Sequence, residues 1–384
     1  MKNYNYTGII AGNSGWVNFM PAVSISMQKK SEKVPSNMES EINEQPSIIE
    51  NLSKKYITPE KYILINLPLN INKVVLIASG SSYHCAYLAA EFLKEEAKCD
   101  AECIYSSEFS QNSMHNFDKE TLYILISQSG ETSDTLEALK YITKHTDKTL
   151  CVTNNEDSTL WQLSNYKVLT EAGKEHSIAS TKAMSAQLFC LYLIALKIIY
   201  AKNKDIQSEI NYINNLPTFL QNILDDTSTI KKAAKKLAKY NSLSILGSRA
   251  FYALAKEGAL KIKETSYINT TAYPQGEFMH GHVAILNQKS ALISLVDNDT
   301  ENLCIRNLAK IKEDYKPFVL AIANKGTSEK LESVSNQSLR LESETKVFSI
   351  FGTLLILQLL ALEIAKELKR NIDRPTGLKK VVIN

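Results

Sequence analysis

Short runs of apolar, β-branched residues alternate with helical stretches along most of this chain. From residue 72 onward, four such runs are separated by segments with helical periodicity: VVLIA (74–78), LYILI (122–126), LCVT (150–153) and KVLT (167–170). A strand that is apolar along its whole length has to be covered on both faces, which is typical of a parallel sheet flanked by helices. The pattern therefore predicts an α/β fold.

The second half of the chain repeats this alternation. After a long apolar helix near 180–202 and a polar stretch at 203–240, strand-like runs return at 242–246, 291–296 and 318–322. Each half has a strand, a Gly-Ser turn, an aromatic residue and an Ala/Leu-rich helix, with Gly80 and Gly247 at matching places. We predict a duplication, with two tandem doubly wound, flavodoxin-like domains.

A length of 384 residues agrees with two or three domains, because one domain takes about 150 residues. Within the lead-in segment, residues 38–52 predict one short helix with a proline near its middle. Disorder is one interpretation of the N-terminal extension. The limits that we predict are an extension at 1–37, lead-in helices at 38–71, a first domain at 72–215, a second at 216–370, and a C-terminal tail at 371–384 that closes the site.

Charge and cysteine usage exclude several partners. Lys and Arg number 44 against 41 Asp and Glu, a net charge of +3 with no long run of one sign, so neither nucleic acid nor an anionic membrane is indicated. None of the six cysteines forms a Cys-x-x-Cys pair or completes a zinc site, and no secretory signal is evident. We expect reduced thiols in a cytoplasmic protein, with no metal and no cofactor.

One apolar segment resembles a membrane span. Residues 348–365 are almost continuously apolar, but the segment contains Gln358 and Glu363. We therefore favour a buried or interface helix over a transmembrane one.

The stretch SQSGETSDT (127–135) follows the strand at 122–126 and contains several hydroxyl side chains around Gly130. In a parallel sheet, helix N-termini at the carboxyl ends of the strands offer unpaired N–H groups to anions. The turn ASGSSYH (78–84) has the same character, and neither a GxGxxG nor a Walker sequence is present. Serine and threonine also cap helices without binding anything. Two such turns in one sheet favour a sugar-phosphate site over simple capping.

A second cluster of polar residues lies at 258–282. Lys261 and Glu264 share one helix face, and His280 follows sixteen residues after Glu264. Near a phosphate site these groups could move protons on a sugar. A surface salt bridge and a loop histidine would give the same spacing, and spacing alone favours that simpler interpretation.

Several longer motifs resemble the sugar-isomerase (SIS) family. These are SQSGETSDT, EHSIASTKA (175–183), LKIKE (260–264) and the spacing from Glu264 to His280, with MESEINEQPSII (38–49) and RPTGLKKVVIN (374–384) at the two ends. The similarity covers about residues 38–384. Within the family, it is strongest to the isomerase part of the glucosamine-6-phosphate synthases.

The resemblance implies a role for individual residues. Glu264 would move a proton between C1 and C2 of a hexose 6-phosphate, and His280 would assist ring opening from the neighbouring subunit of a homodimer. Lys380 would form a Schiff base with the ketose, which requires a neutral amine. Lys261 and Glu175 would position hydroxyl groups, and Ile178 and Ser180 would line the pocket. The phosphate would be bound by Ser82, Ser127, Gln128, Ser129 and Thr132.

Two departures from the family pattern bear on function. The synthases begin with a glutaminase domain whose nucleophilic cysteine follows the initiator methionine, whereas Lys2 follows Met1 here and the first cysteine is Cys85. In MHGH (279–282), Met279 and His282 stand where the family usually has a basic residue and a proline. We expect His282 to be a loop substitution and not a second catalytic histidine.

The resemblance therefore predicts an enzyme that lacks its own glutamine-derived ammonia. The first expectation is a glucosamine-6-phosphate deaminase that releases fructose 6-phosphate and ammonia. The alternatives are a synthase that uses free ammonia or a partner glutaminase, a deglycase or isomerase of another phosphosugar, and a non-catalytic sugar-phosphate sensor.

Overall fold

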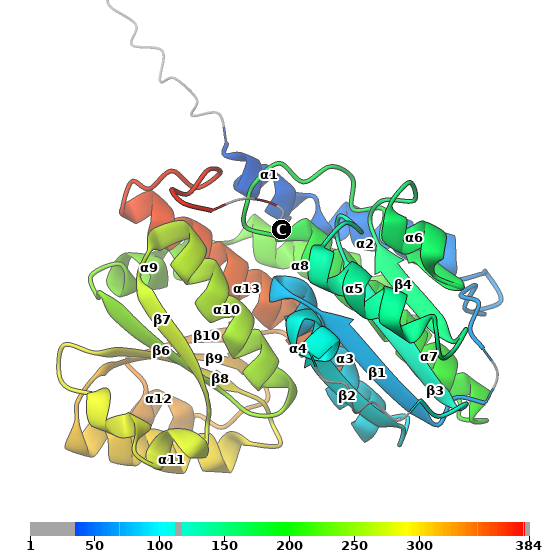
Figure 1. The fold of residues 1–384 in the computed structure, drawn as a ribbon. Helices are drawn as coiled ribbons and strands as arrows, with labels where there is room; N and C mark the ends of the chain where they lie inside the picture. Colours follow the sequence, from blue (N-terminus) through cyan, green and yellow to red (C-terminus); the bar gives the residue numbers. More distant parts are fainter. Residues whose placement is uncertain (1–34, 69, 112–116, 344, 379, 381–384) are drawn as a thin grey trace, which may run out of the picture. The chain divides into compact units, whose positions relative to one another are not determined.

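The computed structural model describes residues 35–68, 70–111, 117–343, 345–378 and 380 (Figure 1). Residues 1–34 of the extension predicted at 1–37 lie outside the described residues. Residue 37 is already the first residue of a helix, so the predicted extension ran slightly too far.

The first half of the described chain forms a five-stranded parallel sheet with the strand order β2-β1-β3-β4-β5. The strands are β1 (Lys73–Ala78), β2 (Asp100–Tyr105), β3 (Thr121–Ser127), β4 (Thr149–Thr153) and β5 (Tyr166–Leu169). The helices of this half are α3 (Gly80–Glu95), α4 (Ser106–Gln111), α5 (Ser133–Ile142), α6 (Thr159–Leu163) and α7 (Lys182–Ala201). All residues of β3 and β4 are buried, as their continuous apolar sequences predict.

The second half forms another five-stranded parallel sheet with the order β10-β9-β8-β6-β7. Its strands are β6 (Ser242–Gly247), β7 (Asn269–Pro274), β8 (Ala291–Val296), β9 (Phe318–Asn324) and β10 (Gln337–Leu341). Its helices are α10 (Ala250–Ser266), α11 (Glu301–Asp314), α12 (Lys330–Val334), α13 (Lys346–Glu367) and the short 3₁₀ turns η1 (Glu277–Met279) and η2 (His282–Ile285). In both sheets the first strand of the half lies between the second and the third, which confirms the predicted duplication of a doubly wound unit.

The glycine match that first indicated the duplication is not a structural equivalence. Gly80 is the first residue of α3, whereas Gly247 is the last residue of β6 and two residues separate it from α10. The duplication is therefore supported by the matching strand order and not by this pair.

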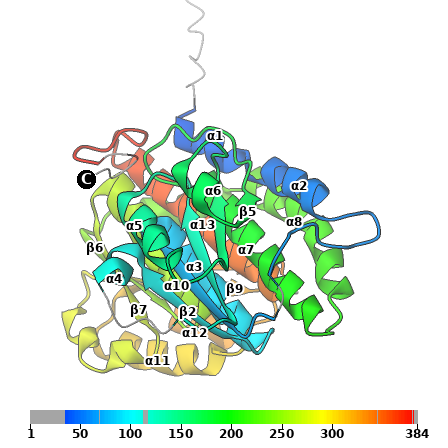
Figure 2. The same cartoon turned by 45° about the vertical axis from the view of Figure 1, so that its right-hand side comes forward.

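The largest hydrophobic core lies between the two sheets and is built from α3, α7, α10 and α13. α3 packs against α7 and α10, and α10 packs against α13 (Figures 1 and 2). Side chains alternate between this inner core and two outer ones, as the period of two along a strand requires. For example, Val74 and Leu76 of β1 face the inner core, while Val75 and Ile77 face α4, α5 and α6. α11 and α12 cover the outer face of the second sheet.

The stretch 38–52, which we predicted as one helix, belongs to two helices. α1 (Asn37–Asn43) ends before Glu44, and α2 (Gln45–Tyr56) begins there, so that Pro46 occupies the first turn of a new helix. Proline is tolerated in a first turn because its missing N–H would have no intrahelical partner there. Two further helices, α8 (Gln207–Asp225) and α9 (Ser228–Leu237), form in the polar stretch of the sequence at 203–240. The domain limit predicted at 215/216 falls inside α8.

The three strands that the sequence analysis missed are all edge strands. β2, β7 and β10 each pair with one neighbour only and are partly exposed. A strand with one free edge and one wet face carries polar residues, so it lacks the continuous apolar sequence that marks the central strands.

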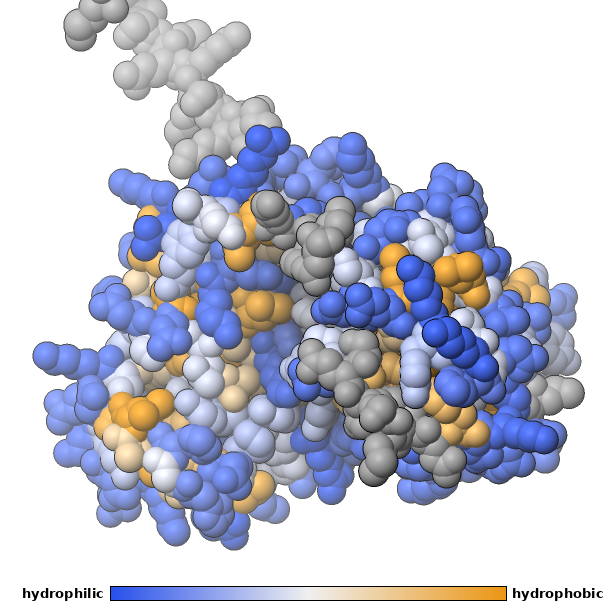
Figure 3. All heavy atoms as spheres, in the orientation of Figure 1, coloured by the Kyte–Doolittle hydropathy of each residue, from blue (hydrophilic) through white to orange (hydrophobic). Residues whose placement is uncertain are grey.

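Two helices, α7 and α13, are long and apolar enough to cross a membrane by length and composition. In both, 89% of the most apolar window is buried inside the structure. α13 covers the segment at 348–365 and packs as a core helix, as predicted. On the face shown in Figure 3 the surface is mainly hydrophilic, with small separate hydrophobic patches.

Candidate active site

The two serine-rich turns lie next to each other at the carboxyl edge of the first sheet. β1 and β3 are neighbouring parallel strands, with Ala78 opposite Ile126 in the register. The turns that follow them lead directly into α3 and α5. The N-termini of both helices therefore point to one place, where the positive ends of their dipoles favour an anion.

The turn after β3 is held by its own hydroxyl groups. The Ser127 and Thr132 hydroxyl oxygens are 2.9 Å apart, the Gly130 amide donates to Ser127 Oγ at 3.1 Å, and the Glu131 amide donates to Ser129 Oγ at 3.1 Å. Gly130 has φ +69°, in the left-handed region that favours glycine. The loop is therefore already shaped before any ligand enters.

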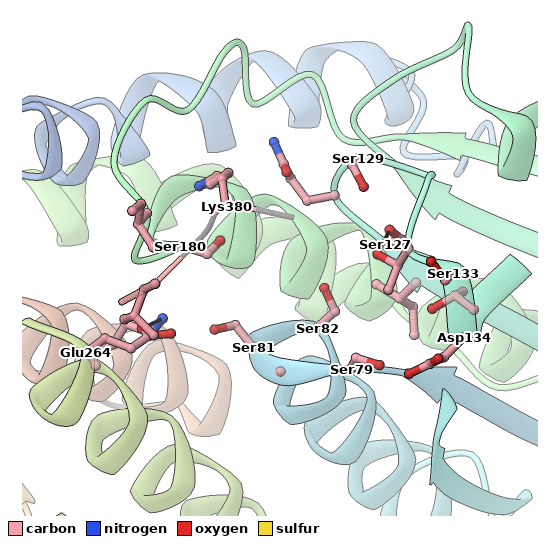
Figure 4. Close-up of a pocket in the computed structure, with 18 residues that line it drawn as sticks. Ser79, Ser81, Ser82, Ser127, Ser129, Ser133, Asp134, Ser180, Glu264 and Lys380 are labelled. Atoms are coloured by element: carbon pink, nitrogen blue, oxygen red, sulfur yellow. Dashed lines mark hydrogen bonds and ion pairs between the residues drawn. The ribbon is translucent and has the colours of Figure 1, made fainter. Parts of the chain in front are cut away.

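A polar cavity of about 350 Å³ opens beside these turns (Figure 4). This volume is at the lower end of the range of about 300–1,000 Å³ that is typical of small-molecule sites. Its lining residues are Ser79, Gly80, Ser81, Ser82, Ile126, Ser127, Gln128, Ser129, Thr132, Ser133, Asp134, Thr135, Ile178, Ser180, Lys261, Glu264, Leu378 and Lys380. In Figure 4 the serines of the α3 and α5 turns lie on one side of the cavity, while Glu264 and Lys380 lie on the other.

Helix α10 carries three charged side chains on one face, and two of them, Lys261 and Glu264, line this cavity. Lys261 Nζ lies 2.5 Å from Glu264 Oε2 and 3.5 Å from Glu257 Oε1. Lys261 and Glu257 are fully buried, whereas Glu264 is partly exposed to the cavity. Burial would lower the pKa of the Lys261 amine, but the Glu257 and Glu264 carboxylates outweigh it and raise this pKa. The lysine is therefore held as a cation beside Glu264.

The C-terminal tail closes the cavity from the opposite side. Lys380 Nζ donates to Glu175 Oε2 at 2.5 Å and to the Ser177 carbonyl oxygen at 2.7 Å. The other oxygen of Glu175 accepts from the backbone amides of Thr181 and Ala183 at the start of α7. Glu175 is thus buried behind the cavity wall. It contacts Lys380 and does not line the cavity. Its role in positioning sugar hydroxyl groups stays a prediction.

His280 is exposed and does not line the cavity of its own chain. It ends the η1 turn, and its neighbour His282 packs its ring against Tyr273, with 4.7 Å between ring centroids.

Ten of the twelve predicted site residues line the one cavity; Glu175 lies behind it and His280 lies away from it. Glu257 was not among the predicted residues, although its spacing to Lys261 and Glu264 (i, i+4 and i+7) places all three on one helix face. Asp134 and Leu378 also line the cavity without having been predicted. No signal in the sequence connects Leu378 with the turns after β1 and β3.

Neither a metal nor a disulfide is evident in the described part of the chain. Among the described residues, no group of three or more His, Cys, Asp or Glu could hold a metal ion. The cysteines at 85, 99, 103, 151, 190 and 304 are free thiols.

Comparison with known proteins gives one family and a consistent set of relatives. The model of the SIS domain matches the chain twice, over residues 69–197 and 236–363. Glutamine–fructose-6-phosphate aminotransferase (isomerizing) of Caldanaerobacter subterraneus subsp. tengcongensis is 33% identical over 356 residues, covering 89% of this chain and 58% of the relative. The same enzyme of Aquifex aeolicus is 31% identical over 344 residues, covering 89% and 57%. The chain thus spans less than two thirds of these relatives.

Solved structures agree with the family match. The C-terminal domain of glucosamine-fructose-6-phosphate aminotransferase from Francisella tularensis superposes with a TM-score of 0.83 at 25% identity, covering 89% of this chain and 99% of that one. Glucosamine-6-phosphate deaminase of Thermotoga maritima superposes with a TM-score of 0.70 at 21% identity, covering 90% and 99%, and shows a shared fold.

Proposed function

This chain belongs to the SIS domain family, and we propose that it is an aminosugar-phosphate isomerase and deaminase, which converts glucosamine 6-phosphate and water into fructose 6-phosphate and ammonia. The observation that carries the proposal is the meeting of Glu264, Lys261 and Lys380 with two hydroxyl-rich turns in one cavity. Such a substrate needs a phosphate-binding site at one end and acid–base groups at the other end.

In this proposal the turns bind the phosphate and α10 performs the chemistry. Ser82, Ser127, Gln128, Ser129 and Thr132 donate to the phosphate oxygens, together with the N-terminal amides of α3 and α5. Ile178 and Ser180 pack along the sugar chain, whose other end reaches the α10 carboxylate.

Glu264 transfers one proton along the opened sugar. Its carboxylate takes the proton from C2 of the aldehyde form and returns it to C1, while the amino nitrogen loses one proton and the aldehyde oxygen gains one, so that the 2-amino group becomes an imine at C2 and C1 becomes an alcohol. Water adds to the imine, and ammonia leaves as the ketone of fructose 6-phosphate forms. The Lys261 cation stabilises the negative charge that develops on the enolamine oxygen.

The remaining predicted residues keep subsidiary roles in the proposal. Lys380 engages the ketose in the reverse direction: its ammonium group gives a proton to Glu175, to which it is bonded, and the neutral amine condenses with the C2 carbonyl to a Schiff base with loss of water. His280 of a second copy assists ring opening, so the working protein is a homodimer, which we place in the cytoplasm.

Assays with glucosamine 6-phosphate test the proposal. Purified protein is incubated with this substrate, and both ammonia and fructose 6-phosphate are measured. We expect equal amounts of the two products, and a loss of at least about 100-fold in kcat in E264Q, since the amide cannot accept a proton. Wild-type protein that forms neither product above the E264Q background would refute the proposal.

A second function is favoured by the relatives, which are glutamine-dependent aminotransferases at 31–33% identity. The reaction of fructose 6-phosphate with ammonia is the reverse of the deamination, so one site catalyses both directions. To distinguish the synthase from the deaminase, the protein is incubated with fructose 6-phosphate and glutamine instead of ammonium, with and without a separate glutaminase. Glucosamine 6-phosphate formed from glutamine would assign the synthase function.

A substrate panel separates the deaminase from an enzyme of another phosphosugar and from a sensor. Ketose and aldose 6-phosphates, assayed for interconversion without ammonia, test an isomerase or deglycase of a different sugar. A sensor would bind a sugar phosphate in calorimetry and convert none of the panel.

A further inference from the structure

His84 is a buried titratable residue that the proposed mechanism does not use. It lies one turn into α3, two residues after Ser82, and is 7% exposed. It does not line the cavity, although Ser81 and Ser82 of the same turn do. Its Nδ1 lies 2.6 Å from Glu257 Oε2 on α10. The first turn of one domain's helix is thus bonded to the charged face of the other domain's helix.

Glu257 is a carboxylate without any exposure, and the described residues bring three polar groups to it. His84 Nδ1 and the Ser81 hydroxyl (3.0 Å) come from α3, and Lys261 Nζ (3.5 Å) comes from α10. Burial would raise the pKa of this carboxyl group, but Lys261, His84 and Ser81 outweigh it and lower the pKa. Because an ionised carboxylate only accepts hydrogen bonds, His84 Nδ1 carries the proton that it donates.

Two carboxylates compete for Lys261. Its amine lies 1.0 Å closer to Glu264 than to Glu257 (2.5 Å against 3.5 Å). A buried carboxylate that loses one donor recovers the lost interaction most readily from the nearest cation. Without His84, we expect Lys261 to turn toward Glu257 and away from Glu264.

We propose that His84 is a positioning residue: through Glu257 it holds the Lys261 ammonium group against Glu264, at the place where the proton transfer occurs. This inference rests on the proposed function. In this proposal Glu257 also connects the turn that binds the phosphate with the helix that carries the base. Ser81 and His84 belong to one turn of α3, and they bind the two oxygens of the Glu257 carboxylate on α10.

The test uses two substitutions of His84 in the full chain. His84→Leu is close to the imidazole in size but has no donor. His84→Asn places an amide nitrogen near the position of Nδ1, so the bond to Glu257 can form again. We expect H84L to lower kcat for glucosamine 6-phosphate by about 10- to 100-fold, because small displacements of catalytic groups cost this much. The KM should change less than about 3-fold, since the phosphate contacts remain, and H84N should recover at least about a third of kcat.

The controls separate positioning from folding. Cys85→Ala changes a buried residue of the same helical turn, whose thiol donates to the Met184 carbonyl at 3.3 Å, and leaves the donors of Glu257 in place. We expect its kcat to stay within about 2-fold of wild type. The thermal unfolding midpoint is measured for every variant. If H84L does not fold, His84→Met replaces it, because its flexible side chain fills a buried space and offers no hydrogen-bond donor.

The outcomes are distinct. An active wild type with an equally active, folded H84L overturns the inference and leaves the proposed function standing. Equal loss in H84L and H84N, with both folded, also overturns it, because the donor would then be irrelevant. A wild type that forms neither product overturns the proposed function and this inference with it.

Discussion

At the scale of single residues, Gly130 shows how closely the turn after β3 is fitted to its surroundings. A Cβ atom at this position would overlap the Ser158 hydroxyl and lie 3.0 Å from Thr153 Oγ1. The backbone also has φ +69°, which costs a residue with a side chain about 1–2 kcal/mol. Both the conformation and the space therefore require glycine.

Gly130→Ala should weaken phosphate binding as well as the fold. The loop would shift to relieve the contact with Ser158, and this shift moves the Ser127 and Thr132 hydroxyls. We expect the Kd for inorganic phosphate, measured by calorimetry, to rise by about 10-fold, which corresponds to about 1.4 kcal/mol.

Gly326→Ala is the matched control for this prediction. A Cβ atom at Gly326 meets nothing within 4 Å, and the residue has no positive φ. Its phosphate affinity should equal that of the wild type. An unchanged Kd in G130A would mean that this turn does not bind the phosphate.

At the scale of elements, helix α1 joins the two segments that close the cavity. The carboxylate of Glu41, which is buried, accepts from the amides of His176 and Ser177 and from the Ser177 hydroxyl. Ser177 in turn accepts from Lys380 through its carbonyl oxygen. At the other end of α1, the Asp373 carboxylate of the tail accepts from the Asn37 and Met38 amides at 2.9 and 3.0 Å.

Glu41→Ala should therefore loosen the loop that carries Ile178 and Ser180. Removing a charged acceptor from buried donors costs about 1.5–3 kcal/mol, and the loss is local to the loop. We expect faster hydrogen exchange of the amides at 175–181, measured by mass spectrometry, and a lower kcat/KM.

Glu39→Gln controls for a general weakening of α1. Glu39 lies on the same helix, is about a third exposed, and pairs with Lys366 of α13 at 2.7 Å. Exchange at 175–181 should stay as in the wild type. Equal exchange in E41A and wild type would show that α1 does not hold the loop.

At the scale of the whole molecule, the two halves of the duplicated fold differ in the turn that follows their third strand. The turn after β3 presents hydroxyl groups, whereas the corresponding stretch after β8 contains Asp297 and Asp299. There Asp297 Oδ1 accepts from the amide and the hydroxyl of Thr300, both at 2.7 Å. The second half contributes Lys261 and Glu264 of α10 to the cavity that the turns of the first half line.

A mixed dimer tests the shared site that we propose. In E264Q and H280A homodimers every site has one defect, and both should be inactive. If His280 serves the partner's site, a mixed dimer of the two variants has one intact site and one site with both defects. Co-expression in equal amounts should then restore about a quarter of the wild-type activity, because about half of the dimers are mixed.

Mixing E264Q with Lys261→Met is the control, since Glu264 and Lys261 serve the same site from one chain. Here each site of a mixed dimer keeps one defect, so no activity should return. Dimeric E264Q/H280A mixtures that stay inactive would place the working histidine in its own chain or exclude it from the reaction.

The sequence by itself determined the fold class and the hydroxyl-rich turns, and its resemblance to the SIS family indicated most of the other groups in the cavity. Buried central strands must be apolar on both faces. An anion site at their carboxyl ends needs hydroxyl groups and glycine directly after the strands. Both features are local, so they are visible in the sequence. The face shared by Lys261 and Glu264 is equally local, because it follows from helical spacing.

Only the tertiary structure decided which of these groups meet. The edge strands β2, β7 and β10 have mixed sequences because only one face is buried, so pairing and not pattern defines them. The contacts of His84 with Glu257, and of Glu175 with Lys380, join residues 173 and 205 positions apart. No periodicity encodes such contacts, because they arise when the two sheets pack their inner helices together and the tail folds back over the site.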